Sequence, residues 1–457
     1  MVALLLYAYA RGNRSSRGIE RECREDVAYR VICANLVPDH STIAEFRKRH
    51  EKTLGELFTQ VLSLCRKAGL VNVGMIAIDG TKISANASLD ANKSYERIVR
   101  EILKEAEETD RREDEQDGEA RGDELPERLR TREGRQAAFR EAKLALDAER
   151  EATGDGTQDP DSEEEPLVRL DLDRERLVNS EQGRRGWLRE GRRQLNELRR
   201  EQARPISRSR SERLQESKRR LEEEHWVEIE SNTAYETCRA TARDRRGRRL
   251  SRPPDPYTPP EQPEGTINTT DHDSRIVRTT GQPAIQGYNA QAAVNEHQII
   301  IAAEVTIDSP DFGHLEPMVN ETISELHKVG VTELPSTIVA DAGYWHKQQM
   351  EKIVAEQHIP VLIPPDSGLR KGKDPRPGWD KGLYAFMRRV LETEHGKTTY
   401  RKRAATIEPV FGQTKFNRGF DRFQRRGRSA ARSEWRFAAA THNLLKLYSN
   451  RTATTEA

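Results

Sequence analysis

The stretch Met-Ile-Ala-Ile-Asp-Gly-Thr-Lys-Ile-Ser, residues 75–84, decides the fold predicted for this chain. Its four apolar residues are followed abruptly by Asp79 and a glycine. This pattern predicts a buried strand that delivers a carboxylate to a functional edge of a sheet. Thr-Ile-Val-Ala-Asp-Ala-Gly-Tyr-Trp, residues 337–345, repeats the pattern with a short β-branched run that ends at Asp341. A third acid, Glu408, lies in Thr-Ile-Glu-Pro-Val-Phe-Gly-Gln-Thr-Lys, residues 406–415.

These three carboxylates are the predicted catalytic and metal-binding residues. Hard cations such as Mg²⁺ prefer oxygen ligands, and phosphoryl transfer commonly uses two of them. A single aspartate in a strand is more often a cap or turn residue, so the prediction depends on the combination of Asp79, Asp341 and Glu408. We expect two Mg²⁺ ions as cofactor, with Mn²⁺ able to substitute.

The composition indicates that a long segment of the chain is exposed to solvent. Of the 457 residues, 34% are apolar and 33% are charged, a poor supply of core-forming side chains. The net charge of +1 hides an uneven distribution and does not exclude a polyanionic partner. The four cysteines show no CxxC pair, which favours a reducing compartment and argues against structural zinc. No apolar run reaches the roughly 18 residues of a membrane span, and we expect a cytoplasmic protein.

The order of patterns predicts four segments. Residues 1–70 have helical periodicity and several arginines, which suits either a helical DNA-binding domain or a plain helical cap on the next domain. Residues 71–92 supply the first part of a catalytic domain, and residues 265–457 supply its remainder. Between them, residues 93–264 form a charged helical insertion with linkers.

The insertion has two interpretations. Many of its acids precede a base by four residues, which favours solvated helices. Such a segment is usually a spacer, but it could also be an arm that grips DNA or a second protomer. The part best suited to phosphate is Arg-Asp-Arg-Arg-Gly-Arg-Arg, residues 243–249.

Beyond the insertion, strand patterns alternate with helical ones. Residues 287–295 and 298–306 predict an antiparallel hairpin, and Asp311 is predicted to cap the helix that follows. The Asp341 strand, a helix, a strand at residues 359–365 and a last helical region with Glu408 complete the order. Thr406 is predicted to cap that last helix, which would place Glu408 in its first turn. This is the mixed five-stranded order of the ribonuclease H-like fold, interrupted after its first strand. We therefore predict an α+β, mixed α/β fold class with an all-α N-terminal domain.

Seven phrases outside the insertion carry a resemblance to a known family. They are YAYARGNRSSR at 7–17, VPDHSTIAEFR at 37–47, AIDGTKISANAS at 77–88, TDHDSR at 270–275, QGYNAQAAV at 286–294, ADAGY at 340–344 and EPVFGQTK at 408–415. In these phrases the chain resembles the DDE transposases of bacterial insertion sequences, in the IS4/IS5-like group and nearest the IS1182 family.

The resemblance implies roles for individual residues. It makes Asp79, Asp341 and Glu408 the metal-binding triad. It also aligns Tyr400, Arg403 and Lys415 with the group's Tyr-xx-Arg-xxx-Glu-xxxxxx-Lys signature, whose basic residues help to position DNA. One spacing departs from the signature, because four residues separate Arg403 from Glu408 instead of three.

Further DNA contacts are predicted from composition. Lys82 follows Asp79 among hydroxyl and amide side chains, which suits a phosphate backbone. Residues 416–436 interleave arginines, among them Arg418, Arg425 and Arg426, with aromatic residues, which favours phosphate contact plus stacking on exposed bases. The alternative is that Phe420 and Phe423 are core residues and the arginines are merely solvated.

The expected function is metal-dependent cleavage of DNA at transposon ends followed by strand transfer. In this hypothesis a freed 3′-OH replaces water in the same site and attacks target DNA. The expected partners are double-stranded DNA, namely terminal inverted repeats and target, and a second copy of the chain in the DNA complex. Two alternatives stay open: a ribonuclease H-like nuclease without strand transfer, and a non-catalytic DNA-binding relic. As a transposase the protein is expected to associate with the nucleoid.

Overall fold

The chain forms two compact units, each with its own apolar core. The computed structural model describes residues 1–117, 172–179, 183–202, 206–243, 255–278, 283–308, 310–366 and 381–456, together with residues 170, 249 and 281. Unit 1 comprises Met1–Lys93, Ala203–Ile206 and Ile267–Ala457, and unit 2 comprises Ser94–Gln202 and Ser207–Thr266. The centre of the predicted arginine-rich segment, residues 244–248, lies outside the described residues.

A mixed sheet organises unit 1. β1 pairs antiparallel with β5 and parallel with β7, while β5 pairs antiparallel with β6 and β7 pairs parallel with β8. The resulting order, β6-β5-β1-β7-β8, confirms the predicted ribonuclease H-like sheet and the α+β fold class. A sixth strand, β4, extends the sheet by pairing with the beginning of β5. The strands are β1 (Met75–Ser84), β4 (Arg275–Val277), β5 (Ile285–Asn295), β6 (Ile300–Thr306), β7 (Thr337–Ala340) and β8 (Val361–Leu362).

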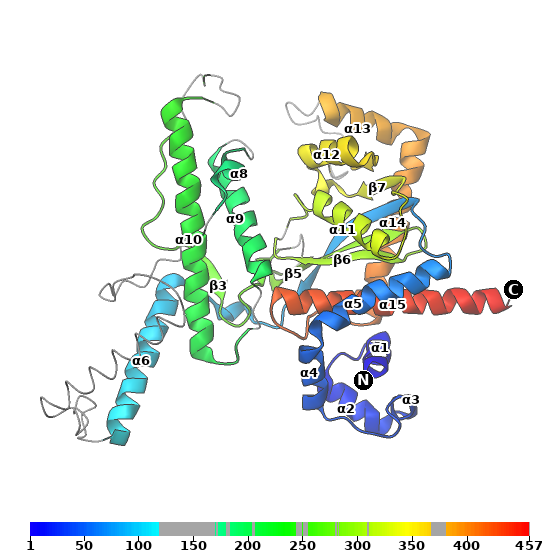
Figure 1. Ribbon diagram of the computed structural model, residues 1–457, viewed down its shortest axis with the longest axis horizontal. Helices are drawn as coiled ribbons and strands as arrows, with labels where there is room; N and C mark the ends of the chain where they lie inside the picture. Colours follow the sequence, from blue (N-terminus) through cyan, green and yellow to red (C-terminus); the bar gives the residue numbers. More distant parts are fainter. Residues whose placement is uncertain are drawn as a thin grey trace, which may run out of the picture. The chain divides into compact units, whose positions relative to one another are not determined.

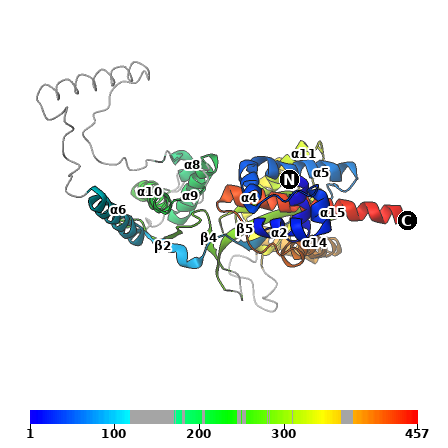
Figure 2. The ribbon, with the colours of Figure 1, turned by 90° about the horizontal axis from the view of Figure 1, so that it is seen from below.

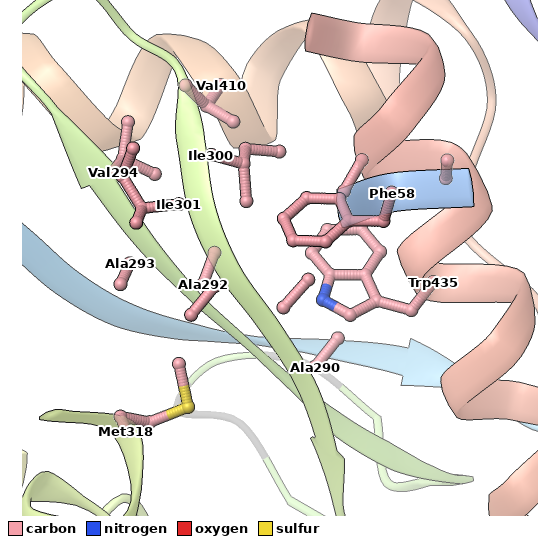
Figure 3. Close-up of a cluster of buried hydrophobic side chains, with 14 of the residues drawn as sticks. Phe58, Ala290, Ala292, Ala293, Val294, Ile300, Ile301, Met318, Val410 and Trp435 are labelled. Carbon is pink, nitrogen blue, oxygen red and sulfur yellow. The ribbon is translucent and has the colours of Figure 1, made fainter. Parts of the chain in front are cut away.

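The centre of the sheet is covered on both sides by helices. β5 is buried from its second residue to its last, and its small residues Ala290, Ala292 and Ala293 leave room for large side chains. Trp435 fills part of this space beside Phe58, as Figure 3 shows, and its indole Nε1 donates to the Gln291 carbonyl at 2.9 Å. β5 also carries four buried polar residues, Gln286, Asn289, Gln291 and Asn295, whose side chains require hydrogen-bond partners.

Helices from distant parts of the sequence pack on the sheet and on one another (Figure 1). α14 contacts β1, β5 and β7, α11 contacts β5 and β6, and α15 contacts β6 and α5. The helices are α5 (Glu51–Lys67), α11 (Leu315–Lys328), α12 (Lys347–Gln357), α13 (Gly382–Glu392), α14 (Glu394–Gly412) and α15 (Arg428–Glu456).

The N-terminal helices share the core of unit 1. They are α1 (Val2–Ala10), α2 (Ser16–Glu25), α3 (Val27–Ile32) and α4 (His40–Arg49). α1 contacts α15 and α4 contacts α5, and Figure 2 shows these helices from below. Leu4, Leu5 and Ile19 belong to the same apolar cluster as Trp435. The buried Arg14 ties these helices to the C-terminal segment, because its Nη2 donates to the Gly419 carbonyl at 2.5 Å and its Nη1 lies 3.5 Å from the Glu434 carboxylate. A separate DNA-reading role for residues 1–70 stays a prediction.

Unit 2 is helical and rich in ion pairs. Its helices are α6 (Tyr95–Asp117), α8 (Arg174–Asn179), α9 (Arg184–Glu201) and α10 (Arg210–Thr241). Within the described residues, one apolar cluster of this unit contains the buried Leu172, Leu177, Leu195 and Val227. Charged contacts add to it, for example Arg199 Nη2 to Glu223 at 2.8 Å. The described part of the predicted charged insertion is therefore helical. Across both units, none of the helices that the structure describes has the length and apolar content to cross a membrane.

Candidate active site

Asp79 and Asp341 occupy equivalent positions on neighbouring strands. The parallel pairing of β1 with β7 ends at Ile78 and Ala340, so the next residue on each strand is one of these two aspartates. Paired strands lie about 4.8 Å apart, which places the two carboxylates side by side. Asp341 also begins the 3₁₀ turn η3 (Ala342–Tyr344), where its Oδ1 accepts from the Gly343 N–H at 2.9 Å.

One detail of the prediction is wrong, because Asp79 does not end its strand. β1 continues to Ser84, paired with β5 alone, while β7 turns away at Asp341. Asp79 therefore reaches the edge of the sheet because its neighbour on one side stops. The apolar run of β1 could not show this, because such a run indicates that a strand is buried but not which strands lie on either side of it.

Both aspartates are held in an environment that disfavours their charged forms. Burial and the nearby charge of Asp341 raise the pKa of Asp79 to about 6, against the opposing effect of Arg403. Burial also raises the pKa of Asp341. Two partly desolvated carboxylates that repel one another gain from a cation placed between them.

Arg403 is the side chain that links the third predicted acid to this pair. Its Nη1 donates to Oδ2 of Asp79 at 3.0 Å, and its Nη2 lies 3.9 Å from Oε1 of Glu408. The Glu408 side chain is 64% exposed, whereas that of Asp79 is 19% exposed. Glu408 thus faces the pair across a guanidinium group. Nowhere in the described parts of the chain do three or more acids, histidines or cysteines converge into a ready metal site.

The helix that carries Glu408 begins earlier than predicted. The sequence favoured Thr406 as its cap, but α14 starts at Glu394 with Thr393 as the cap, and Thr406 is buried inside it. Pro409 consequently lies within the helix and leaves the Ala405 carbonyl without its usual N–H partner. The Gln298 side chain donates to that carbonyl at 3.1 Å, which compensates for the missing bond.

A π-helical turn, η5 (Gln413–Asn417), follows α14 and carries Lys415. Turns of this type are frequent at functional sites. The Lys415 ammonium donates to Oγ1 of Thr81 at 3.2 Å and to the carbonyl of Lys82 at 3.0 Å, so it lies against β1. Tyr400 is half-buried, with its ring centroid 5.9 Å from the Arg403 guanidinium.

The sequence pattern did not reveal the role of Asp311. It predicted a helix cap, but α11 begins after His314 without a side-chain cap. Instead, Oδ1 of Asp311 accepts from Lys82 at 3.3 Å, from Asn289 at 2.7 Å and from Gln291 at 2.8 Å. The available signal was Asn289 and Gln291, two of the four polar residues of the buried β5, since buried amides require partners.

The remaining predicted DNA-binding residues differ in what they contact. Arg418 is half-buried with its Nη1 3.4 Å from Nδ1 of His442, and Arg425 pairs with Glu51. Arg426 is exposed, and its Nε donates to the Asn86 carbonyl at 3.0 Å.

The prediction that aromatic residues of this segment stack on bases is wrong for Phe420 and Phe423. Phe420 is 2% exposed and packs on Trp435, and Phe423 is fully buried against Tyr288. Their spacing serves the core, a role that composition alone does not distinguish from base stacking. Phe416, which is 85% exposed, is free of this packing.

The donor chemistry of the site suits a divalent metal. Asp79, Asp341 and Glu408 offer only carboxylate oxygens, which are the ligands that Mg²⁺ prefers. The charge of Asp341 acts unfavourably on ionised Asp79, and the contact of Asp79 with Arg403 offsets part of this repulsion, as a bound cation would. The residues present therefore fit a divalent metal ion, and Arg403 competes for the oxygen of Asp79.

Comparison with known families agrees with this fold. Residues 264–444 match the family described as Transposase DDE domain, and residues 1–49 match the family described as Transposase domain (DUF772). Comparison with curated proteins and with solved structures gave no match. The chain belongs to the DDE transposases, and its role is in transposition. The pairing of these two domains fits the IS1182 family of insertion-sequence transposases.

Proposed function

We propose that this transposase cuts DNA at the ends of its element and joins the freed 3′ ends to target DNA. The observation that carries the proposal is the placement of Asp79 and Asp341 on adjacent strands, with Glu408 linked to them through Arg403. Acids from three distant segments of the chain are thereby brought to one edge of a ribonuclease H-like sheet.

Asp79, Asp341 and Glu408 are the residues that would hold the metal, which we propose to be two Mg²⁺ ions. When bound, Mg²⁺ supplies a lowered pKa for an attacking water and charge stabilisation for the departing 3′ oxygen. The protein contributes the orientation of the acids, since Asp341 is fixed by the Gly343 N–H and Asp79 by its place in β1.

The basic residues around the acids would hold the DNA backbone. Lys415 lies against β1 within the same part of the sheet, and Arg403 bonds to Asp79 directly. Lys82, Tyr400, Arg418, Arg425 and Arg426 are proposed to extend this contact surface. Because Arg425 is paired with Glu51, DNA binding there requires exchange of that partner for a phosphate.

Recognition of the DNA ends is proposed for the N-terminal helices. A pocket of about 560 Å³ is lined by Arg11, Arg17 and Arg21 together with Glu22. All three arginines are exposed, and within the described residues none makes an ion pair. Arg14, by contrast, is buried and bound to the C-terminal segment. Three unpaired guanidinium groups in one pocket suit a DNA phosphate.

A metal-dependent nicking assay on a DNA fragment that bears the ends of the element tests the proposal. We expect cleavage in Mg²⁺ followed by joining to a target plasmid, and neither product from Asp79→Asn. Cleavage without joining by the wild-type protein would support a simple nuclease. Binding without cleavage would support a non-catalytic relic. We also propose that two copies of the chain act together in the DNA complex, which size-exclusion chromatography of the protein with end DNA tests.

A further inference from the structure

We propose that Asp311 is a positioning residue of this active site, which holds the Lys82 ammonium in place for a DNA phosphate bound next to Asp79 and Asp341. The inference rests on the proposed function, because it concerns how the same site holds DNA. Asp311 lies outside the triad and outside the signature that contains Arg403 and Lys415.

The contacts of Asp311 join two strands through one oxygen. Its Oδ1 accepts from Lys82 on β1 and from Asn289 and Gln291 on β5. Lys82 is directly opposite Asn289 in the antiparallel register, and Gly80 is opposite Gln291. Residues directly opposite one another project to the same face of a sheet. The three side chains that Asp311 binds therefore project from the same face of the sheet.

The same network reaches the turn that carries Asp341. The hydroxyl of the buried Tyr344 in η3 donates to Oε1 of Gln291, and the Gln291 amide donates to Asp311. A Cβ added at Gly343 would lie 3.0 Å from Oδ1 of Asp341 and 3.6 Å from Oδ2 of Asp311. Both carboxylates thus border the same glycine, so the Asp311 network and the Asp341 turn are adjacent.

The charges around Lys82 explain why it needs an anchor. Burial lowers the pKa of Lys82, and the charges of Asp311, Asp79 and Asp341 oppose this effect. Lys82 is thus attracted by three acids, of which only Asp311 is in direct contact. Without Asp311, we expect the ammonium to move toward Asp79 or Asp341 and to compete for the oxygens that the metal requires.

The space around the Asp311 carboxylate leaves no room for a side chain at position 80. A Cβ at Gly80 would lie 2.5 Å from both Oδ1 of Asp311 and the Gln291 amide nitrogen, and 2.7 Å from Oδ1 of Asn289. The residue that follows Asp79 must therefore be small for this network to form. Among the described residues, Oδ2 of Asp311 accepts no hydrogen bond, so the fixed position of the side chain depends on Oδ1.

Steady-state cleavage of end DNA by four variants tests the inference. Asp311→Asn keeps an oxygen that can accept hydrogen bonds, so we expect it to fold, but it removes the negative charge that attracts the Lys82 ammonium. We expect Asp311→Asn and Lys82→Gln each to lower kcat about tenfold with KM within about twofold of wild type. The double variant should be no slower than Lys82→Gln alone, because coupled residues are not additive. Asp366→Asn, which removes the acid beside Arg388 at 2.9 Å, is the matched control and should cleave normally.

A second measurement does not depend on catalysis. Acylation by an amine-reactive reagent, read by mass spectrometry, should label Lys82 several-fold faster in Asp311→Asn than in wild type. Lys402, which pairs with Glu296 at 2.8 Å, is the internal control and should not change. Unchanged labelling of Lys82, or additive losses of kcat in the double variant, would overturn the inference. Failure of the wild type to cleave would instead remove the proposed function, and the labelling would still decide whether Asp311 holds Lys82.

Discussion

Nη1 of Arg403 lies 3.0 Å from the Asp79 carboxylate, while Nη2 of the same guanidinium lies 3.9 Å from Glu408. A basic side chain of the protein thus lies between two of the acids to which we assign the metal. In the absence of metal, this contact offsets part of the repulsion between Asp79 and Asp341. The same guanidinium becomes available to a phosphate if a metal ion takes its place.

Replacing Arg403 should therefore strengthen metal binding. We expect Arg403→Gln to bind Mn²⁺ about tenfold more tightly than wild type, because the ion no longer competes with a cation at Asp79. Isothermal titration calorimetry without DNA measures this directly. Lys402→Gln removes a neighbouring positive charge that pairs with Glu296 and should leave the affinity unchanged. Equal affinities for wild type and Arg403→Gln would contradict the prediction.

Removing either strand acid should abolish the chemistry and spare DNA binding. We expect Asp79→Asn and Asp341→Asn to lower the cleavage rate at least about a thousandfold, because each removes a charged metal ligand. Affinity for end DNA, measured by fluorescence anisotropy with Ca²⁺ present, should stay within about threefold of wild type. An Asp341→Asn protein that cuts at the wild-type rate would rule out the proposed site.

Adding a side chain after Asp79 should destabilise the protein. Gly80→Ala brings a methyl group within 2.5 Å of the Asp311 and Gln291 side chains, and we expect a loss of about 2 kcal/mol in the free energy of unfolding. Gly412→Ala is the control, because Gly412 is helical and no atom lies within 4 Å of the added Cβ apart from its chain neighbours and its own helix backbone. For Gly412→Ala we expect the free energy of unfolding to increase by roughly 0.5–1 kcal/mol. Urea unfolding followed by tryptophan fluorescence compares the two.

A buried acid away from the active site should make stability depend on pH. Asp271 is fully buried and accepts from Tyr288 at 2.7 Å and from the Gly427 N–H at 3.2 Å. Burial and the charge of Asp273 raise its pKa to about 6. Between about pH 4 and 6 the folded state therefore binds more protons than the unfolded state, and stability falls as pH rises.

The Asp271→Asn variant tests this sign. Between pH 4 and pH 7, titration of Asp271 should lower the free energy of unfolding of the wild type by about 2–3 kcal/mol. The variant should lack that loss, so its stability relative to the wild type should increase as pH rises. Urea unfolding at the two pH values measures the difference, with the exposed Asp90→Asn as control. A constant difference between Asp271→Asn and wild type at both pH values would contradict the assignment.

Much of the fold follows from local patterns. The apolar runs that end at Asp79 and Asp341, and the alternation around Tyr288, identify the strands because side-chain burial has a period that sequence displays. Their order along the chain was sufficient to predict the sheet. The strand end at Asp79 and the helix start at Thr406 were predicted wrongly, because both depend on neighbouring elements.

The active site likewise has features that follow from the sequence and features that depend on the tertiary structure. The sequence by itself determined the strand order, the three candidate acids and the family to which the chain belongs, since these depend on residue types in a fixed order. Only the tertiary structure decided that Arg403 lies against Asp79, that Asp311 holds Lys82 and that Phe420 and Phe423 are buried. Asp311 is separated from Lys82 by 229 residues and Arg403 from Asp79 by 324. Contacts over such separations are set by how the sheet and helices pack, which no local pattern reports.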